Sequence, residues 1–60
     1  MKRSKALNQI KQCGWDNDTS RAAVLTAQAG IGKAASRKAF LDGQRIKERG
    51  EPRPIDASGK

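Results

Sequence analysis

The chain has 60 residues, and its 13 Lys and Arg against six Asp and Glu give a net charge of +7. A chain this short forms one small domain that buries only about 60% of its unfolded surface. It contains no histidine and one cysteine, Cys13, so it has no internal disulfide, no zinc ligand set and no thiol–imidazole pair for nucleophilic catalysis. We therefore expect a protein that is not an enzyme and needs no cofactor or metal. The positive charge, which is spread along the chain, favours a polyanionic partner.

No stretch of about 18 apolar residues is present, as a membrane-spanning helix would require. The basic start, Met1–Lys5, is not followed by the apolar run of a signal peptide. These two features predict a cytoplasmic protein with no membrane partner.

A first helix is predicted over residues 4–13, where Ala6, Leu7, Ile10 and Cys13 recur at helical spacing. Gly14 follows them, and glycine commonly ends a helix, so the helix is expected to stop there. Trp15 comes next, where its indole is expected to cover the core while the ring N–H reaches a backbone carbonyl or water.

A second helix is predicted over residues 20–29, because residues 16–20 are a run of Asp, Asn, Thr and Ser that favours a helix N-cap. The Gly30–Gly32 segment then breaks the helical pattern. A third helix is predicted over residues 33–49, continuing through Gly43, where the absence of a side chain would allow close packing. Residues 51–60 hold two prolines and little to bury, and predict a flexible tail.

The expected fold class is therefore all-α, a small three-helix domain over residues 1–50 followed by the tail at 51–60. Its core depends on few large apolar side chains, so a partner is expected to supply part of the stability.

Residues 25–40, LTAQAGIGKAASRKAF, resemble the core of a helix-turn-helix DNA-binding unit. The match rests on Ala29-Gly30-Ile31, because in that family a small residue ends the first helix, a glycine takes the left-handed turn and an apolar residue fills the gap between the helices. The second helix of such a unit enters the major groove of DNA. The chain departs from the family at Thr26, where alanine is preferred, and at Ser36, where many members have an apolar β-branched residue.

The resemblance implies a helix-turn-helix-like domain whose recognition helix starts near Gly32 or Lys33. Arginine and lysine pair with guanine, and serine contacts bases or phosphates. The residues then expected to contact nucleic acid, with Ala34 beside them, are Lys33, Ser36, Arg37, Lys38 and Arg45. Phosphate-positioning contacts are expected from Lys2, Arg3, Lys5, Lys47, Arg49 and Arg53. Structural roles are expected for Gly30, Ile31, Trp15 and Phe40.

Residues 39–53, AFLDGQRIKERGEPR, carry a second resemblance, to small bacterial and phage proteins related to ribosome modulation factor. The shared pattern is an Ala-aromatic pair, a glycine within a helix and a later Gly-x-Pro-Arg. This chain continues with Pro54-Ile55-Asp56, where such proteins usually carry Asn-Pro-Tyr or Cys-Pro-Tyr. The resemblance points to RNA or ribosome binding.

Three functions are therefore compatible with the sequence. The first is a DNA-binding regulator of transcription, or an excisionase, of the kind found on phages and plasmids. It would act as a homodimer, because one short recognition helix gives limited affinity. The second is an RNA- or ribosome-binding protein that uses the same basic surface. The third is an inhibitor encoded by a mobile element, which would dock Trp15 or Phe40 on a larger host protein.

The residues also allow two plainer interpretations. An Ala-Gly-Ile-Gly break can join any two helices of a structural hairpin. The cations between Arg45 and Arg53 alternate with Glu48 and Glu51, so this stretch can be a solvated helix end with weak local ion pairs.

Overall fold

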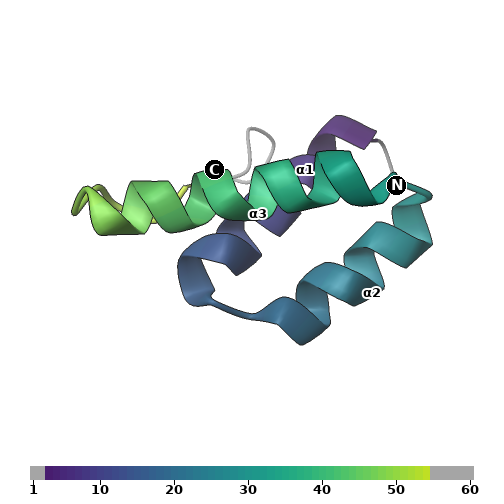
Figure 1. Ribbon diagram of the computed structural model, residues 1–60, viewed down its shortest axis with the longest axis horizontal. Coiled ribbons are helices and arrows are strands. Elements are labelled where there is room, and N and C mark those ends of the chain that lie inside the picture. The colour runs from purple at the N-terminus through teal and green to yellow at the C-terminus, as the bar shows by residue number, and fades with distance from the viewer. Residues whose placement is uncertain (1–2, 55–60) are drawn as a thin grey trace.

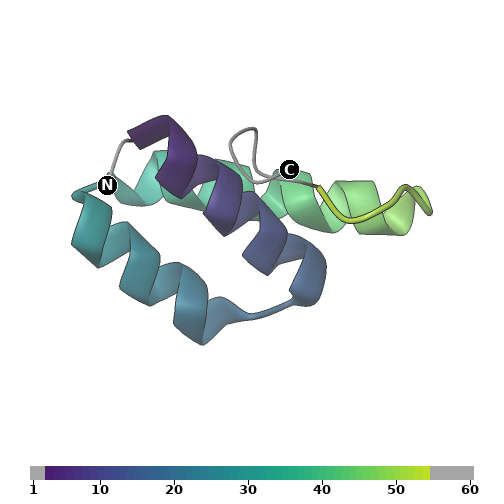
Figure 2. The same ribbon diagram turned by 180° about the vertical axis from the view of Figure 1, so that it is seen from behind.

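The computed structural model describes residues 3–54 and folds most of them into three helices. These are α1 (Arg3–Asp16), α2 (Thr19–Ala29) and α3 (Lys33–Glu48). In Figure 1, α2 runs back beside α1 and α3 crosses α1, and Figure 2 shows the same crossing from behind. The predicted all-α, three-helix fold is confirmed, and the expected continuation of the third helix through Gly43 is confirmed with it. No helix in this described part of the chain is long and apolar enough to cross a membrane.

The core lies along α1, because α1 contacts both of the other helices far more extensively than they contact each other. Ile10 is its largest fully buried side chain. Six further apolar residues are buried. Four of these are small, Ala6, Cys13, Ala22 and Ala39, and the other two are Leu25 and Ile31. Leu7, Ala29, Ala35 and Phe40 pack against this cluster from its edge. Four of these seven core residues are alanine or cysteine, and such small side chains fill a core only if the helices approach one another closely.

Each of the three helices ends in the same backbone motif. Asn17, Gly30 and Gly50 follow the helices with φ angles of 59°, 64° and 77°, in the left-handed region. The residue after each of these three donates its amide to the carbonyl of the residue five positions before it, as Ile31 does to Thr26 at 3.1 Å. This pattern is the Schellman motif, which satisfies the last free carbonyls of a helix. Glycine and asparagine occupy its central position because they tolerate positive φ at little cost.

The expectation that Gly14 ends the first helix is wrong. Gly14 is a buried residue inside α1, which continues through Trp15 to Asp16. Asn17 ends α1 instead, and its amide donates to the Gly14 carbonyl at 3.1 Å. Asp18 then caps α2, as its carboxylate accepts the amide of Arg21 at 3.1 Å. The capping cluster was thus correctly located, and α2 begins at Thr19.

Gly14 and Gly43 are the points at which α1 and α3 touch through their backbones. A methyl group on Gly14 would lie 2.8 Å from the carbonyl carbon of Phe40, and one on Gly43 would lie 2.9 Å from the amide nitrogen of Trp15. Both distances are shorter than van der Waals contact, and backbone atoms cannot rotate aside. Both positions therefore need glycine because another helix backbone lies too close for a side chain. Both lie within helices, so the reason is not a turn.

The contact between α2 and α3 is slight and includes a pair of hydroxyl groups. The Thr26 hydroxyl donates to the Ala22 carbonyl at 2.7 Å within α2, and it also hydrogen-bonds the Ser36 hydroxyl of α3. Thr26 and Ser36 are the two positions at which the chain departs from the helix-turn-helix pattern. The two departures form one interhelical hydrogen bond.

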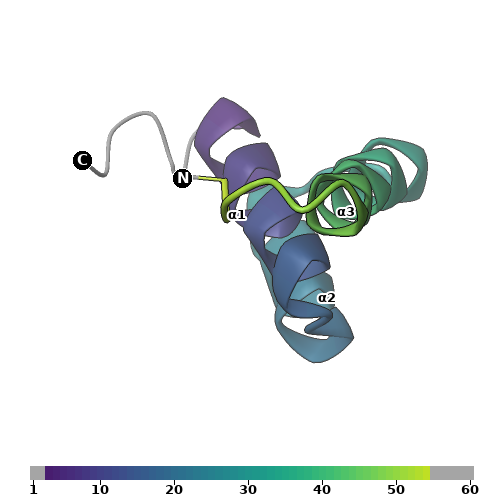
Figure 3. The ribbon, with the colours of Figure 1, turned by 90° about the vertical axis from the view of Figure 1, so that its left-hand side faces the viewer.

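Residues 51–54 have no regular secondary structure, but they are held against α1. The indole N–H of Trp15 donates to the Glu51 carbonyl at 3.3 Å, and Arg53 binds the Asp16 carboxylate at 2.7 Å. Figure 3 shows this segment running from the end of α3 across α1. The first part of the predicted flexible tail is therefore anchored. Residues 55–60, like Met1 and Lys2, lie outside the described residues.

Replacing Gly43 with alanine is expected to lower the free energy of unfolding by about 2 kcal/mol, because the added methyl forces α1 and α3 apart. Alanine in an open helical site would instead stabilise by about 1 kcal/mol, so the sign of the change reports the backbone contact. Urea unfolding followed by circular dichroism measures this change in the free energy of unfolding.

The control is Gly32→Ala, since Gly32 has φ −65° and open space around its Cα. Because Gly32 is the N-cap of α3, where glycine is preferred over alanine, this control should lower stability by less than about 1 kcal/mol. A Gly43→Ala variant as stable as the parent would contradict the close packing.

Candidate nucleic-acid interface

The outward side of α3 carries three cations on one strip. We call Arg37, Lys38 and Arg45 the basic face; all three side chains are exposed. At about 100° per residue they fall within an arc of about 100°, opposite the buried Ala39 and Gly43. From Arg37 to Arg45 the rise of the helix is about 12 Å. These residues therefore form a continuous strip along the middle of the helix.

The basic face makes no ion pair within the described residues, although Asp42 lies at its edge, next to Lys38 and Arg45. Residues 3–54 contain ion pairs between Arg49 and Glu51 and between Arg53 and Asp16, and neither pair includes a cation of this face. Leu41 lies in the centre of the strip and remains 42% exposed. Ala34 is exposed at its beginning. A surface on which an exposed apolar side chain lies beside cations without ion pairs can contact both negative charge and flat apolar groups.

Lys33 and Ser36 lie to one side of the basic face. Lys33 is exposed on the first turn of α3, whose N-cap, Gly32, offers no side chain to the free amides. Ser36 is half-buried, and its hydroxyl is bonded to Thr26. Of the five residues expected to contact nucleic acid, the structure thus places four on exposed surface. The fifth, Ser36, lies at the contact between α2 and α3, because it faces the partner helix and not solvent.

The residues expected to position phosphates fall into two groups. Arg3 and Lys5 are exposed on the first turn of α1. The other group lies at the far end of α3, where the cations are already engaged. There Lys47 lies 5.2 Å from the centre of the Trp15 ring, Arg49 pairs with Glu51 at 3.1 Å, and Arg53 pairs with Asp16. Lys2 is outside the described residues. Sequence periodicity alone does not reveal the two contacts that reach α1, from Lys47 of α3 to Trp15 and from Arg53 to Asp16.

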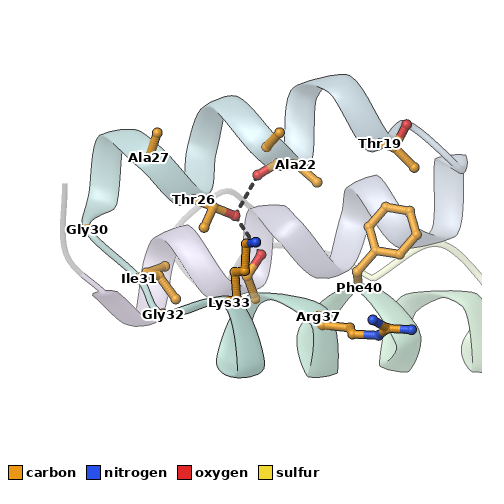
Figure 4. A pocket seen from close by; sticks show the side chains of 12 residues that line it. Thr19, Ala22, Thr26, Ala27, Gly30, Ile31, Gly32, Lys33, Arg37 and Phe40 are labelled. Carbon is orange, nitrogen blue, oxygen red and sulfur yellow. Dashed lines mark hydrogen bonds between the residues drawn. The ribbon is translucent and has the colours of Figure 1, made fainter.

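A groove separates α2 from α3, and we refer to it as the α2–α3 groove. The two helices diverge from their shared turn, and the groove between them has a volume of about 830 Å³. Its apolar wall comes from α2 and from the Phe40 ring, which stands on α3 toward α2 in Figure 4. Lys33 and Arg37 line it on the α3 side, and the hydrogen bond between Thr26 and Ser36 lies within it. Sequence reasoning missed this groove, although the small residues Ala23 and Ala27 on α2 were a signal.

Trp15 and Phe40 have structural positions. Both are half-buried, and Phe40 packs on the core. The ammonium of Lys47 lies over the Trp15 ring, and the ring N–H of Trp15 donates to the Glu51 carbonyl. The expected hydrogen bond from the indole N–H to a backbone carbonyl is present. The cation–π contact and this hydrogen bond both hold residues that follow Gly43 against the end of α1.

The described residues contain no cluster of three or more His, Cys, Asp or Glu side chains that could hold a metal ion. Cys13 is 3% exposed, and burial raises the pKa of its thiol above the ordinary value. A buried neutral thiol is a small apolar core residue and a poor nucleophile.

No protein-family model, no curated protein and no solved structure matches this chain. The feature that stands out in the described residues is the combination of the unpaired basic face on α3 with the adjoining α2–α3 groove.

The Asp16–Arg53 pair predicts a pH-dependent contact. The hydrogen bond from Arg53 holds the pKa of the Asp16 carboxyl below its ordinary value. The pair's stabilising contribution is therefore present at pH values above the ordinary pKa of Asp16, and it is lost as the pH falls through the lowered pKa.

Replacing Arg53 with glutamine should raise the Asp16 pKa, as measured by a carboxyl carbon NMR titration. Arg49→Gln is the control, because Arg49 binds Glu51 and should leave the Asp16 pKa unchanged. An identical Asp16 titration in the Arg53 variant would show that the pair does not form.

Proposed function

We propose that the protein binds nucleic acid, with duplex DNA as its preferred form, and that the basic face of α3 makes the principal contacts. The observation that carries the proposal is that Arg37, Lys38 and Arg45 project from one exposed strip without acidic partners in the described chain. Unpaired cations at this density attract phosphates and release counterions on binding. The net charge of +7 supports attraction to a polyanion at long range.

Duplex DNA is favoured because the basic face belongs to a single helix. A helix fits the major groove of B-form DNA, which is about 12 Å wide, whereas the major groove of A-form RNA is too narrow for side chains to read. Arginine in the groove pairs with guanine, and the exposed Leu41 can contact a thymine methyl. Lys33 and the uncapped first turn of α3 would then meet a backbone phosphate.

The turn before α3 also supports this proposal. Gly30 is in the left-handed conformation, and Ile31 is 6% exposed and belongs to the core cluster. The resemblance to helix-turn-helix units implies this glycine conformation and a buried apolar residue at these positions, although α2 and α3 make only a slight contact with each other. We therefore propose a non-enzymatic role as a small cytoplasmic DNA-binding regulator of transcription, of the phage or plasmid type.

The decisive experiment compares fluorescent duplex DNA, single-stranded DNA and structured RNA as ligands at two salt concentrations. Duplex DNA should bind tightest, and its affinity should fall steeply with salt. Preferential binding of structured RNA would replace the DNA proposal with the RNA-binding alternative. If none of the three polymers binds above background, nucleic-acid binding is excluded.

Replacing Arg37 and Lys38 together with alanine should abolish preference among DNA sequences. The single variants Arg37→Ala and Arg21→Ala form a matched pair, because each removes one exposed arginine and Arg21 lies on α2. Only Arg37→Ala should weaken binding strongly. Equal losses in the two variants would show that net charge, and not the basic face, determines binding.

A further inference from the structure

The α2–α3 groove is an apolar channel with positive charge on one side only. Its α2 side is built from Thr19, Ala22, Ala23, Thr26 and Ala27, none of which is charged, and its α3 side presents Lys33 and Arg37. Within Thr19–Ala29, Arg21 is the single charged residue, and it does not line the groove. A ligand that fits must therefore be apolar toward α2 and negative toward α3.

The apolar surface extends beyond the groove over the outer side of α2. Ala23 and Ala27 are exposed, and Val24 beside them is 53% exposed. Alanines at a spacing of four residues let the backbone of another helix approach closely, as small residues do at helix crossings. The groove is open and follows α2 from Thr19 to Ala27, about 12 Å or two helical turns, which suits contact with one side of a helix and would leave an isolated acyl chain exposed to water.

We propose that the α2–α3 groove docks an acidic amphipathic helix of a partner protein. The apolar stripe of that helix would lie on Ala23, Ala27 and the Phe40 ring, and its flanking Glu or Asp side chains would pair with Lys33 and Arg37. This is the helix-in-groove mode of recognition, with charge setting the orientation. Because Lys33 and Arg37 also belong to the proposed DNA-contacting surface, the partner helix would compete with nucleic acid.

Charge complementarity favours a partner protein over a second copy of this chain. The chain carries +7, and none of its described helices has an acidic flank: α1 contains Asp16, α2 contains no acid, and α3 contains Asp42 and Glu48. A second copy in the groove would therefore not bring carboxylates to Lys33 and Arg37 in sufficient number. An acidic helix supplies them directly.

The test uses a designed peptide of about 18 residues, long enough to form a helix, with Leu and Ala on one face and Glu on its flanks. A peptide of the same composition in scrambled order, without the apolar stripe, is the control. Binding is measured by fluorescence anisotropy, and amide NMR shifts of the protein locate it. The amphipathic peptide should bind about tenfold more tightly than the scrambled one, and the shifts should centre on Ala23, Ala27 and Phe40.

Two variants separate docking from simple charge attraction. Ala27→Lys adds a cation inside the groove, and Gln28→Lys adds the same charge on the next residue of α2, which does not line the groove. Docking predicts that Ala27→Lys weakens peptide binding about tenfold while Gln28→Lys does not. Duplex DNA binding should not weaken in either variant, so failure of this proposal is distinguishable from failure of the proposed DNA binding.

Three results would overturn the proposal. The first is equal binding of the amphipathic and scrambled peptides. The second is peptide binding by Ala27→Lys that equals or exceeds that of Gln28→Lys, which would mean that charge alone attracts the peptide. The third is self-association of the protein alone that Ala27→Lys abolishes, as measured by sedimentation, because this would assign the groove to a second copy.

Discussion

The structure depends on the backbone contact between α1 and α3 at Gly14 and Gly43. Because neither residue has a side chain, Phe40 and Trp15 of the opposite helices lie where a Cβ would otherwise be. This closeness lets small residues such as Ala6 and Ala39 fill the core, so that 60 residues with few large apolar side chains still bury a common centre. The same contact fixes the direction in which α3 presents its opposite side to solvent.

α2 is held mainly by α1, and this arrangement leaves its side toward α3 open. The α2–α3 groove exists because Thr26 and Ser36 satisfy each other while the rest of the two helices diverges. The proposed DNA contacts and the proposed docking of an acidic helix adjoin each other on α3 and share Lys33 and Arg37. One surface would thus serve both, and competition between the two ligands follows from that overlap.

The positive charge of the chain is used in two different ways. Arg37, Lys38 and Arg45 form a strip with no acid bound to it in the described residues, whereas Lys47, Arg49 and Arg53 contact Trp15, Glu51 and Asp16. In the second set, Lys47 of α3 and Arg53 after it contact the end of α1, while Arg49 pairs locally with Glu51. A count of Lys and Arg therefore overstates the number of cations available to a polyanion.

The three helices, an N-cap for α2 within residues 16–20 and the turn at Gly30 and Ile31 are predictable from the sequence, because helical periodicity and backbone preference are local properties. A local pattern does not distinguish a glycine that ends a helix from one that allows a close crossing, and it therefore predicts the end of the first helix at Gly14 instead of Asn17. Three features follow only from the tertiary fold: Ser36 faces Thr26, the segment after Gly50 lies on Trp15, and a groove separates α2 from α3. These outcomes depend on the helix crossings, which side chains distant in sequence establish together.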